Sequence, residues 1–329
     1  MEAAFKNRGG MLGVLFVLAV MVLMVSPFFG SSTVGWSDVF SSQESSVATK
    51  IFWQIRLPRV LVSFLAGATF ALCGMVFQAL FRNPLVSPST LGVSTGASLG
   101  ASVYIWLGLS FSLVGISGVS IFAFLGALLS ILIVWSLARV QYNETSTARM
   151  LLAGVAVSFF FASLIIFIQY LSDVTESFKI TRWLMGGLFV FGYKPLFDIL
   201  PFVLIGCGTI WYFTNELNVF ATGEETAQSR GVDVGVMVKI IFILVSLIIG
   251  GLVAVCGPIA FIGIIAPHIA RLLIGSDHRY LTPATFLFGG LFLTLCDTIA
   301  RTVIAPVEIP VGVLTALLGG PFFLWMLRR

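Results

Sequence analysis

Long uncharged apolar stretches alternate with short polar segments along nearly the whole chain. Between Arg82 and Arg139, fifty-six consecutive residues carry no charged side chain, and comparable stretches recur toward both ends. A bilayer core of about 30 Å requires roughly 20 apolar residues per helix, because backbone groups in lipid must satisfy one another within the segment. The pattern therefore predicts an all-α polytopic membrane protein.

About ten transmembrane helices fit this pattern. The eighth is short, and Gly or Pro interrupts several apolar runs. Broken backbone at membrane depth is tolerated mainly where protein or a water-filled cavity covers it, which is typical of transporters, although helix turns alone explain most of these breaks. The predicted spans lie near 11–29, 59–80, 91–109, 114–138, 149–171, 194–213, 237–256, 261–274, 283–300 and 309–327.

The distribution of cations predicts the orientation of the chain. Lys6 and Arg8 precede the first span and Arg328 and Arg329 follow the last, so the positive-inside rule places both ends in the cytoplasm of an inner-membrane protein. On this topology eleven of the eighteen Lys and Arg residues lie inside and seven outside. The first span lacks a small-x-small cleavage site, so we expect a retained helix and not a signal peptide.

Composition excludes other classes of protein. Hydrophobic residues make up 58% of the chain and charged residues 10%, which leaves too little polar surface to cover a water-soluble core. A net charge of +4 is ordinary for a protein that faces anionic lipid and predicts no nucleic-acid partner. No linker or low-complexity segment divides residues 1–329, so we expect a single transmembrane domain.

No set of residues predicts a metal site or a bound cofactor. The four cysteines lie in or beside apolar spans, where they are typical of small buried side chains. His268 and His278 are the only histidines. Two isolated histidines make a poor metal site, so we interpret them as packing and hydrogen-bonding residues.

Three further segments suggest local structure. The apolar piece 183–191 is too short to cross a bilayer, and we interpret it as a helix lying at the outer surface. The segment 214–236 is the longest polar stretch on the predicted cytoplasmic side, where a partner could bind it. Gly92, Gly96 and Gly100 line one side of a predicted helix, which favours close packing within the chain over a subunit interface.

Two blocks of motifs resemble a known family. The first comprises Arg-Leu-Pro-Arg at 56–59, Gly67-Ala68, Gly74, Gln78, Arg-Asn-Pro-Leu at 82–85 and Pro88. The second comprises Gly-Pro-Ile-Ala-Phe-Ile-Gly at 257–263, Pro-His-Ile-Ala-Arg at 267–271, Asp-His-Arg at 277–279, Asp297, Arg301 and Glu-Ile-Pro-Val-Gly at 308–312. With these blocks the chain resembles the permease subunits of ABC importers for iron-siderophore, haem and cobalamin, the ten-span type II class.

The resemblance implies a type II ABC importer permease fold and several partners. In that family two permeases, identical or paralogous, enclose one pathway, two ATPase subunits bind at the cytoplasmic side, and a substrate-binding protein docks outside. This chain has no Gly-x-x-x-x-Gly-Lys-Ser/Thr phosphate cradle. We therefore expect a transport subunit that is not itself an enzyme and that draws its energy from a separate ATPase chain.

The resemblance also implies a role for three arginines near outer span ends. Arg56, Arg59 and Arg301 run against the positive-inside rule. In relatives, outer arginines receive glutamates of the binding protein, and a planar guanidinium offers two parallel donors to a carboxylate. Anchoring to lipid phosphate, or an internal pair such as Asp297 with Arg301, is the alternative.

A cytoplasmic loop resembles the one through which importers contact their ATPases. Its characteristic residues here are Glu224, Glu225, Ala227 and Gly231. Gly231 is expected to allow the sharp turn between two short helices, because glycine adopts positive φ angles without steric cost. A merely solvated loop is the alternative.

Four residues match positions that form the cytoplasmic constriction in relatives. They are Asn83 and Leu85 after the second span, and Ser146 and Thr147 before the fifth. Short polar side chains beside an apolar plug could close a gate against small ions and still part for a bulky solute. The alternative interpretation of Asn83-Pro84 is a turn that ends a helix.

Other functions remain open at this level. An ion-coupled secondary transporter is the competing class, because Asp297 and Glu308 lie at or near membrane depth and intramembrane acids often relay protons. An anchor or receptor would not need so many Gly and Pro breaks. For the cargo, the resemblance favours a ferric siderophore, with cobalamin and haem next, and no residue distinguishes them.

Overall fold

Helices account for most of the computed structural model, which describes residues 8–30, 35, 39, 47–113, 115–138 and 147–328. Each of the ten predicted spans contains a helix, and the boundaries differ from the predicted ones by five residues or fewer. The ten helices are α1 (Arg8–Val25), α4 (Leu57–Leu80), α5 (Val93–Trp106), α6 (Gly118–Ala138), α7 (Thr147–Leu171), α9 (Lys194–Tyr212), α12 (Val234–Cys256), α13 (Ile262–Ile274), α14 (His278–Ala300) and α15 (Val311–Leu327).

Seven of these helices, within the part of the chain that the structure describes, are long and apolar enough to cross a membrane. The other three are α5, α13 and α15. With a rise of about 1.5 Å per residue, α5 and α13 each span about 20 Å, less than a bilayer core. Irregular segments, 81–92 and 257–261, precede these two helices and supply the rest of the path.

Helix α4 is the centre of the bundle. Nearly all of its residues are buried, and it packs most extensively against α14, α13 and α9. Small residues permit this packing, since a Cβ at Gly67 would overlap Leu293 and the Gly289 carbonyl, and one at Gly74 would overlap the Gly263 backbone. Close approach of backbones is how transmembrane helices gain packing energy without a hydrophobic driving force.

The predicted glycine face of 92–100 packs within the chain. Gly96 lies against Gly126 and Ser130 of α6, and Gly100 lies against the Phe122 carbonyl of the same helix. This confirms intrachain packing as the use of these glycines.

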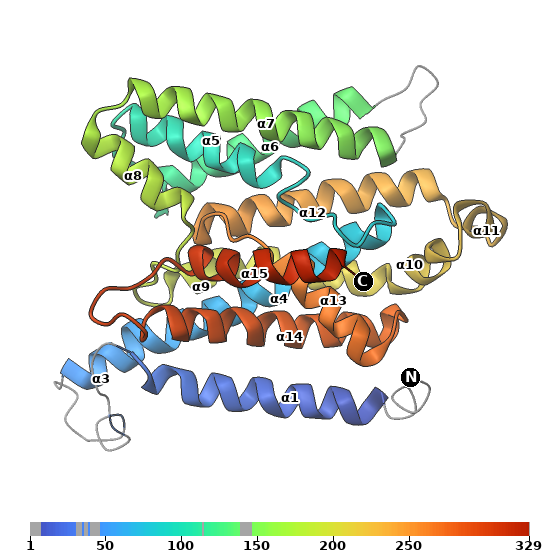
Figure 1. The fold of residues 1–329 in the computed structure, drawn as a ribbon, viewed down its shortest axis with the longest axis horizontal. Coiled ribbons are helices and arrows are strands. Elements are labelled where there is room, and N and C mark those ends of the chain that lie inside the picture. The colour runs from blue at the N-terminus through green and yellow to red at the C-terminus, as the bar shows by residue number, and fades with distance from the viewer. Residues whose placement is uncertain are drawn as a thin grey trace.

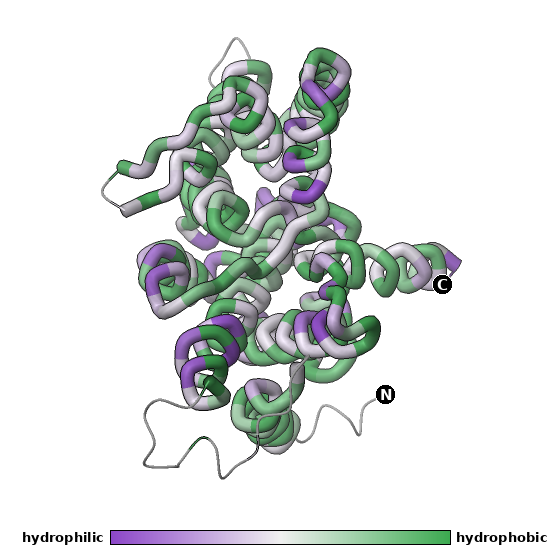
Figure 2. Tube along the Cα trace, turned by 90° about the vertical axis from the view of Figure 1, so that its left-hand side faces the viewer, coloured by the Kyte–Doolittle hydropathy of each residue, from purple (hydrophilic) through white to green (hydrophobic). Residues whose placement is uncertain are grey.

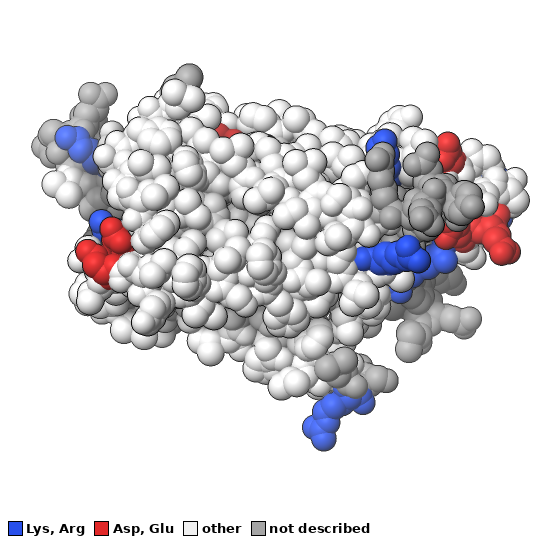
Figure 3. All heavy atoms as spheres, turned by 90° about the horizontal axis from the view of Figure 1, so that it is seen from above, with Lys and Arg blue, Asp and Glu red and all other residues white. Residues whose placement is uncertain are grey.

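The bundle has two polar ends and an uncharged middle. In Figure 1 the helices run lengthwise, with the first turn of α1, α10 (Thr214–Ala221) and α11 (Glu224–Ser229) at one end, which we name the α11 end. The opposite end, the α8 end, carries α3 (Val47–Ile51) and α8 (Val174–Leu184). Figure 3 shows almost all visible charged side chains at these two ends. The wide uncharged belt between them is the surface that lipid would cover.

Viewed from the α8 end, the apolar residues dominate the bundle and α15 projects from its side (Figure 2). Leu317, Leu318 and Leu324 of α15 are exposed. Leu152, Phe159 and other large apolar residues on α7 are exposed as well. These surfaces are available to lipid or to another transmembrane chain.

The remaining elements are short. They are η2 (Ser26–Phe28), the π-helical turn η3 (Phe52–Arg56) and the antiparallel pair β1 (Ser112–Leu113) and β2 (Ile116–Ser117).

The prediction of a helix over residues 183–191 is wrong, since most of this segment is irregular. The helix of this region is α8, which begins earlier because the Asp173 side chain accepts a hydrogen bond of 2.6 Å from the Glu176 amide and caps it. The helix ends before Gly186. The positive φ angles of Gly186 (+66°) and Gly192 (+67°) direct the segment that follows into an irregular path.

Candidate functional site

A buried ion-pair network joins three elements at the α8 end. Arg59 of α4 lies 2.9 Å from one Asp297 carboxylate oxygen of α14, and 2.7 Å from Glu308, which lies between α14 and α15. The Arg59 side chain is 12% exposed and Asp297 is fully buried, whereas Glu308 is 43% exposed. Arg59 therefore crosslinks α4 to α14 and to the start of α15.

Two further arginines surround this network. Arg301 Nη2 donates to the Ser26 carbonyl at 3.0 Å, and its Nε lies 3.6 Å from Asp297, which is an electrostatic contact too long for a hydrogen bond. Arg56 Nη1 donates to the Phe28 carbonyl at 3.0 Å. Both side chains are buried, with exposures of 3% and 4%, so they hold the chain after α1 against α4 and α14.

The structure thus brings all three predicted docking arginines to one place. They line a cavity of about 200 Å³ together with Glu308, Gly30, Ile51 and Ile55. The internal pair between Asp297 and Arg301, the alternative suggested by sequence, is present. Docking of a binding protein to these arginines stays a prediction, and in this structure their guanidinium groups bind internal acceptors.

The two motif blocks pack against each other where α4 contacts α13. Gln78 Nε2 donates to the Gly263 carbonyl at 3.2 Å, and Arg271 Nη2 donates to Gln78 Oε1 at 3.2 Å. Pro88 also lies against Gly263. The two broken segments, 81–92 and 257–261, therefore lie close to each other, and the side chain of Gln78 and the Gly263 carbonyl beside them are hydrogen-bonded within the protein.

The predicted gate residues lie in two places. Asn83 follows α4 at the α11 end, and its Oδ1 accepts a hydrogen bond of 2.9 Å from the Leu85 amide, which is the turn that the alternative interpretation predicted. Leu85 is half-buried. Thr147 is the first residue of α7, and Ser146 lies outside the described residues.

The predicted coupling segment forms α10 and α11. Glu224 and Glu225 occupy the exposed first turn of α11, and Ala227 is fully buried and anchors the helix. Gly231, at φ +82°, follows α11 and ends it, since its amide bonds to the Gln228 carbonyl and the next amide to that of Ala227. The prediction that Gly231 forms the turn between the two short helices is wrong. Gly223, at φ +134°, occupies that position.

A polar clamp fixes α10 to α14. Asn218 Nδ2 donates to Asp277 at 2.9 Å, and Asn218 Oδ1 accepts from the His278 amide at 2.8 Å. Asp277 also lies 3.5 Å from Arg8 of α1. Burial alone would raise the pKa of Asp277, but hydrogen bonds from the Arg279 amide and Asn218, and the charges of Arg279 and Arg8, hold that pKa below its usual value.

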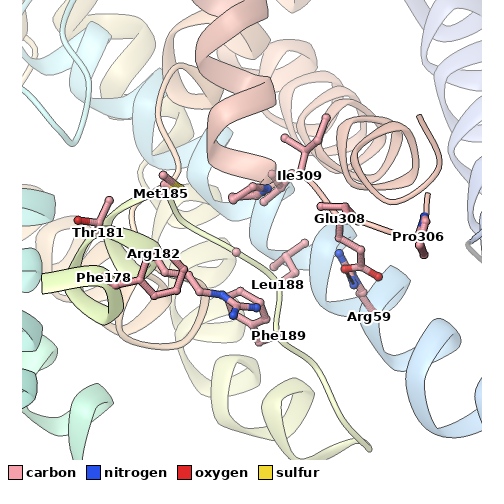
Figure 4. A pocket seen from close by; sticks show the side chains of 14 residues that line it. Arg59, Phe178, Thr181, Arg182, Met185, Leu188, Phe189, Pro306, Glu308 and Ile309 are labelled. Carbon is pink, nitrogen blue, oxygen red and sulfur yellow. Dashed lines mark hydrogen bonds and ion pairs between the residues drawn. The ribbon is translucent and has the colours of Figure 1, made fainter. Parts of the chain in front are cut away.

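A second, larger cavity opens at the α8 end. It has a volume of about 590 Å³ and lies between one face of α8, the segment 187–189 and the chain from Pro306 to Val311 (Figure 4). Arg59 and Glu308 form one side, and Arg182 of α8 extends from the other beside the Phe189 ring. The Arg182 guanidinium carbon lies 5.2 Å from the centre of that ring, a cation–π contact.

Sequence reasoning missed Arg182, Phe189 and Asn218. No motif singled them out, because each gains its role from contact with a distant or irregular segment. It named Asp297 and Glu308 as acids near membrane depth but not as the joint partners of Arg59. The helical period of α8, which places Phe178, Thr181 and Arg182 on one face with Met185 directly after the helix, is the signal that could have identified the lining of the larger cavity.

Comparison with known proteins identifies the family. The sequence profile of the FecCD transport family matches residues 17–329, which is nearly the whole chain. The chain belongs to the FecCD transport family. Among its relatives is the hemin transport system permease HmuU of Yersinia pestis, 36% identical over 320 residues, which cover 97% of this chain and 95% of that protein. The cobalamin import system permease BtuC of Halobacterium salinarum is 39% identical over 281 residues, 85% of this chain and 74% of that protein.

A solved structure agrees with this assignment. A metal-chelate type ABC transporter in an inward-facing conformation is similar with a TM-score of 0.84 and 29% identity, over 98% of this chain and 99% of that one. This FecCD chain is thus a multi-pass permease subunit of a type II ABC importer for metal chelates, a family in which the ATPase is a separate subunit. The family assignment decides against an ion-coupled carrier, and the pairing of Asp297 and Glu308 with Arg59 accounts for both acids.

Proposed function

We propose that this permease carries a ferric siderophore into the cytoplasm across the inner membrane. Two copies, or one copy and a paralogue, enclose the pathway, a separate ATPase drives it, and an exported binding protein supplies the chelate. Both chain termini face the cytoplasm. The two-ended architecture supports this orientation, since the three proposed docking arginines and the exposed acidic first turn of α11 lie at opposite ends of the bundle, on either side of the uncharged belt.

We assign ATPase coupling to Glu224, Glu225, Ala227 and Gly231 at the α11 end. The first two residues are exposed, and the buried Ala227 with the Asn218 clamp would transmit a push on α11 to α14. A force on a loosely tethered loop would not reach the spans, so a rigid attachment is what coupling requires.

Charge reversal of α11 tests both the coupling and the function. In proteoliposomes that contain the permease, its ATPase and its binding protein, we expect ATP-dependent accumulation of ferric siderophore. The double variant Glu224→Lys/Glu225→Lys should reduce ATPase co-purification and uptake at least tenfold. Glu176→Lys, the same change on α8 at the other end, should preserve both. Uphill accumulation without any ATPase would contradict the proposal.

We assign docking of the binding protein to Arg56, Arg59 and Arg301. Glu308 is exposed and occupies Arg59 in this structure, so an incoming carboxylate would compete with it. Glu308→Gln should therefore tighten binding-protein affinity several-fold and leave the melting temperature nearly unchanged, as expected for a partly exposed ion pair. Surface plasmon resonance with the permease in nanodiscs measures this. Weaker binding by Glu308→Gln would show that Glu308 itself contacts the partner and would refute the competition.

We assign the cytoplasmic gate to Asn83, Leu85, Ser146 and Thr147. Leu85 is half-buried at the α11 end and could meet its counterpart in the second permease. In Leu85→Cys we expect a crosslink between permeases in at least one nucleotide state. The native chain is the control, because Cys73, Cys256 and Cys296 are buried and Cys207 is half-buried. Absence of the crosslink in every nucleotide state would remove Leu85 from the gate.

A further inference from the structure

The larger cavity at the α8 end has the features of a binding site for cargo. We propose that it receives a carboxylate-bearing chelate with an apolar body, and that Arg182 donates hydrogen bonds to the carboxylate. The inference rests on the proposed import of metal chelates and narrows their chemical class.

The cavity is pre-formed by backbone contacts. The Gly187 amide donates to the Cys256 carbonyl at 3.1 Å, and the Gly312 amide lies 3.4 Å from the Gly186 carbonyl. A Cβ at Gly186 would overlap the Pro258 carbonyl, and one at Gly312 would overlap that of Met185. The segment after α8 is therefore held tightly to the ends of α12 and α15, so the cavity does not need a ligand to form it.

Its size and lining suit an organic molecule. About 590 Å³ lies within the range of roughly 300–1,000 Å³ typical of small-molecule sites. Most of the lining is apolar, with two aromatic rings, and a few polar groups lie among them, which is the usual pattern of such a site. The apolar lining residues include Phe178, Met185, Leu188, Phe189, Ile309 and Pro310.

The cavity is lined by two positive charges and one negative charge, and the negative charge is already paired. Arg59, Arg182 and Glu308 line it, and Arg59 is already paired with Asp297 and Glu308. Among the described residues, no carboxylate forms an ion pair with Arg182, whose guanidinium stacks on Phe189 instead. The ring restrains the planar guanidinium beside the cavity, where its parallel donors suit a carboxylate.

These features discriminate among chelates. A macrocycle or siderophore with peripheral carboxylates satisfies both the apolar wall and Arg182. A cargo whose rim carries only neutral amides would bury that wall but offer no carboxylate to Arg182, so we expect it to bind less tightly.

Equilibrium binding of two matched probes tests the inference. Protoporphyrin IX carries two carboxylates and its dimethyl ester carries none, while both have the same apolar body. Binding is followed by porphyrin fluorescence with the full chain in phosphatidylcholine nanodiscs, so that no anionic lipid competes. We expect the dicarboxylate to bind about tenfold more tightly than the ester, which is the effect of one charge-assisted hydrogen bond, and Arg182→Gln to abolish this preference.

Lys179→Gln is the matched control, since Lys179 is exposed on the same helix and does not line the cavity. This variant should keep the full preference. Equal binding of the two probes, an undiminished preference in Arg182→Gln, or binding of neither probe would overturn the inference. Failure of the proposed function has a different signature, namely no ATP-dependent uptake of any chelate by the assembled wild-type complex.

Discussion

Asp297→Asn is expected to lower the free energy of unfolding by about 3–5 kcal/mol, the usual cost of removing one partner of a buried ion pair. Asp297 is fully buried, receives Arg59 at 2.9 Å and lies 3.6 Å from Arg301. The amide retains the shape but removes the charge that compensates two arginines. Arg301 is only 3% exposed, so in this variant its buried positive charge would lose the carboxylate that lies 3.6 Å from it in the native protein. Denaturant titration of the purified protein in detergent, followed by tryptophan fluorescence, measures the loss.

The same substitution at Asp198 is the control. Asp198 pairs with Lys194 at 2.9 Å on α9, but the Lys194 side chain is 52% exposed. Exposed pairs of this kind contribute about 0–1 kcal/mol, because water solvates either partner when the other is lost. Equal destabilisation by the two variants would show that burial of the Asp297 network has no special importance.

Gly74→Val is expected to destabilise the protein by about 3 kcal/mol or more and to reduce the yield of folded permease. A Cβ at this position would overlap both the Cα and the carbonyl of Gly263, so α4 and α13 would have to separate along their contact. Backbone cannot move aside as a flexible side chain can, which places this change at the upper end of overpacking costs. Separation would also break the Gln78 bond to Gly263.

Gly208→Val provides the comparison. Gly208 lies inside α9, and a Cβ there would meet no atom within 4 Å, so this variant carries the same change in helix propensity without the overlap. Melting temperature and size-exclusion profile in detergent distinguish the two variants. A Gly74→Val protein as stable as Gly208→Val would contradict the backbone contact between α4 and α13.

Much of the fold was predictable because lipid imposes a simple rule. All ten spans appear as helices within five residues of the expected boundaries, including the short α13. The prediction for 183–191 failed because hydrophobicity there reflects contact with the cavity and the core, whereas the helix α8 was determined by the Asp173 cap.

Local geometry was harder to predict than the element that contains it. Gly231 was expected between two short helices, but a sequence with two glycines, Gly223 and Gly231, does not reveal which one separates α10 from α11. Asn83 was expected either as a gate or as a turn, and its bond to the Leu85 amide shows the turn. The gate depends on a second permease, which one chain cannot supply.

By itself, the sequence determined the membrane class, the ten spans, the family and the alternation of apolar belt and polar ends. Those properties follow from the thickness of the bilayer and from the identity of short motifs, and neither requires knowledge of distant contacts. Only the tertiary structure decided that Arg59 pairs with Asp297, 238 residues away, that Asn218 holds α10 to α14, and that Arg182 faces a cavity. Such partners are determined by where helix ends meet in space, because an ion pair or hydrogen bond acts over a few ångströms whatever the separation in sequence.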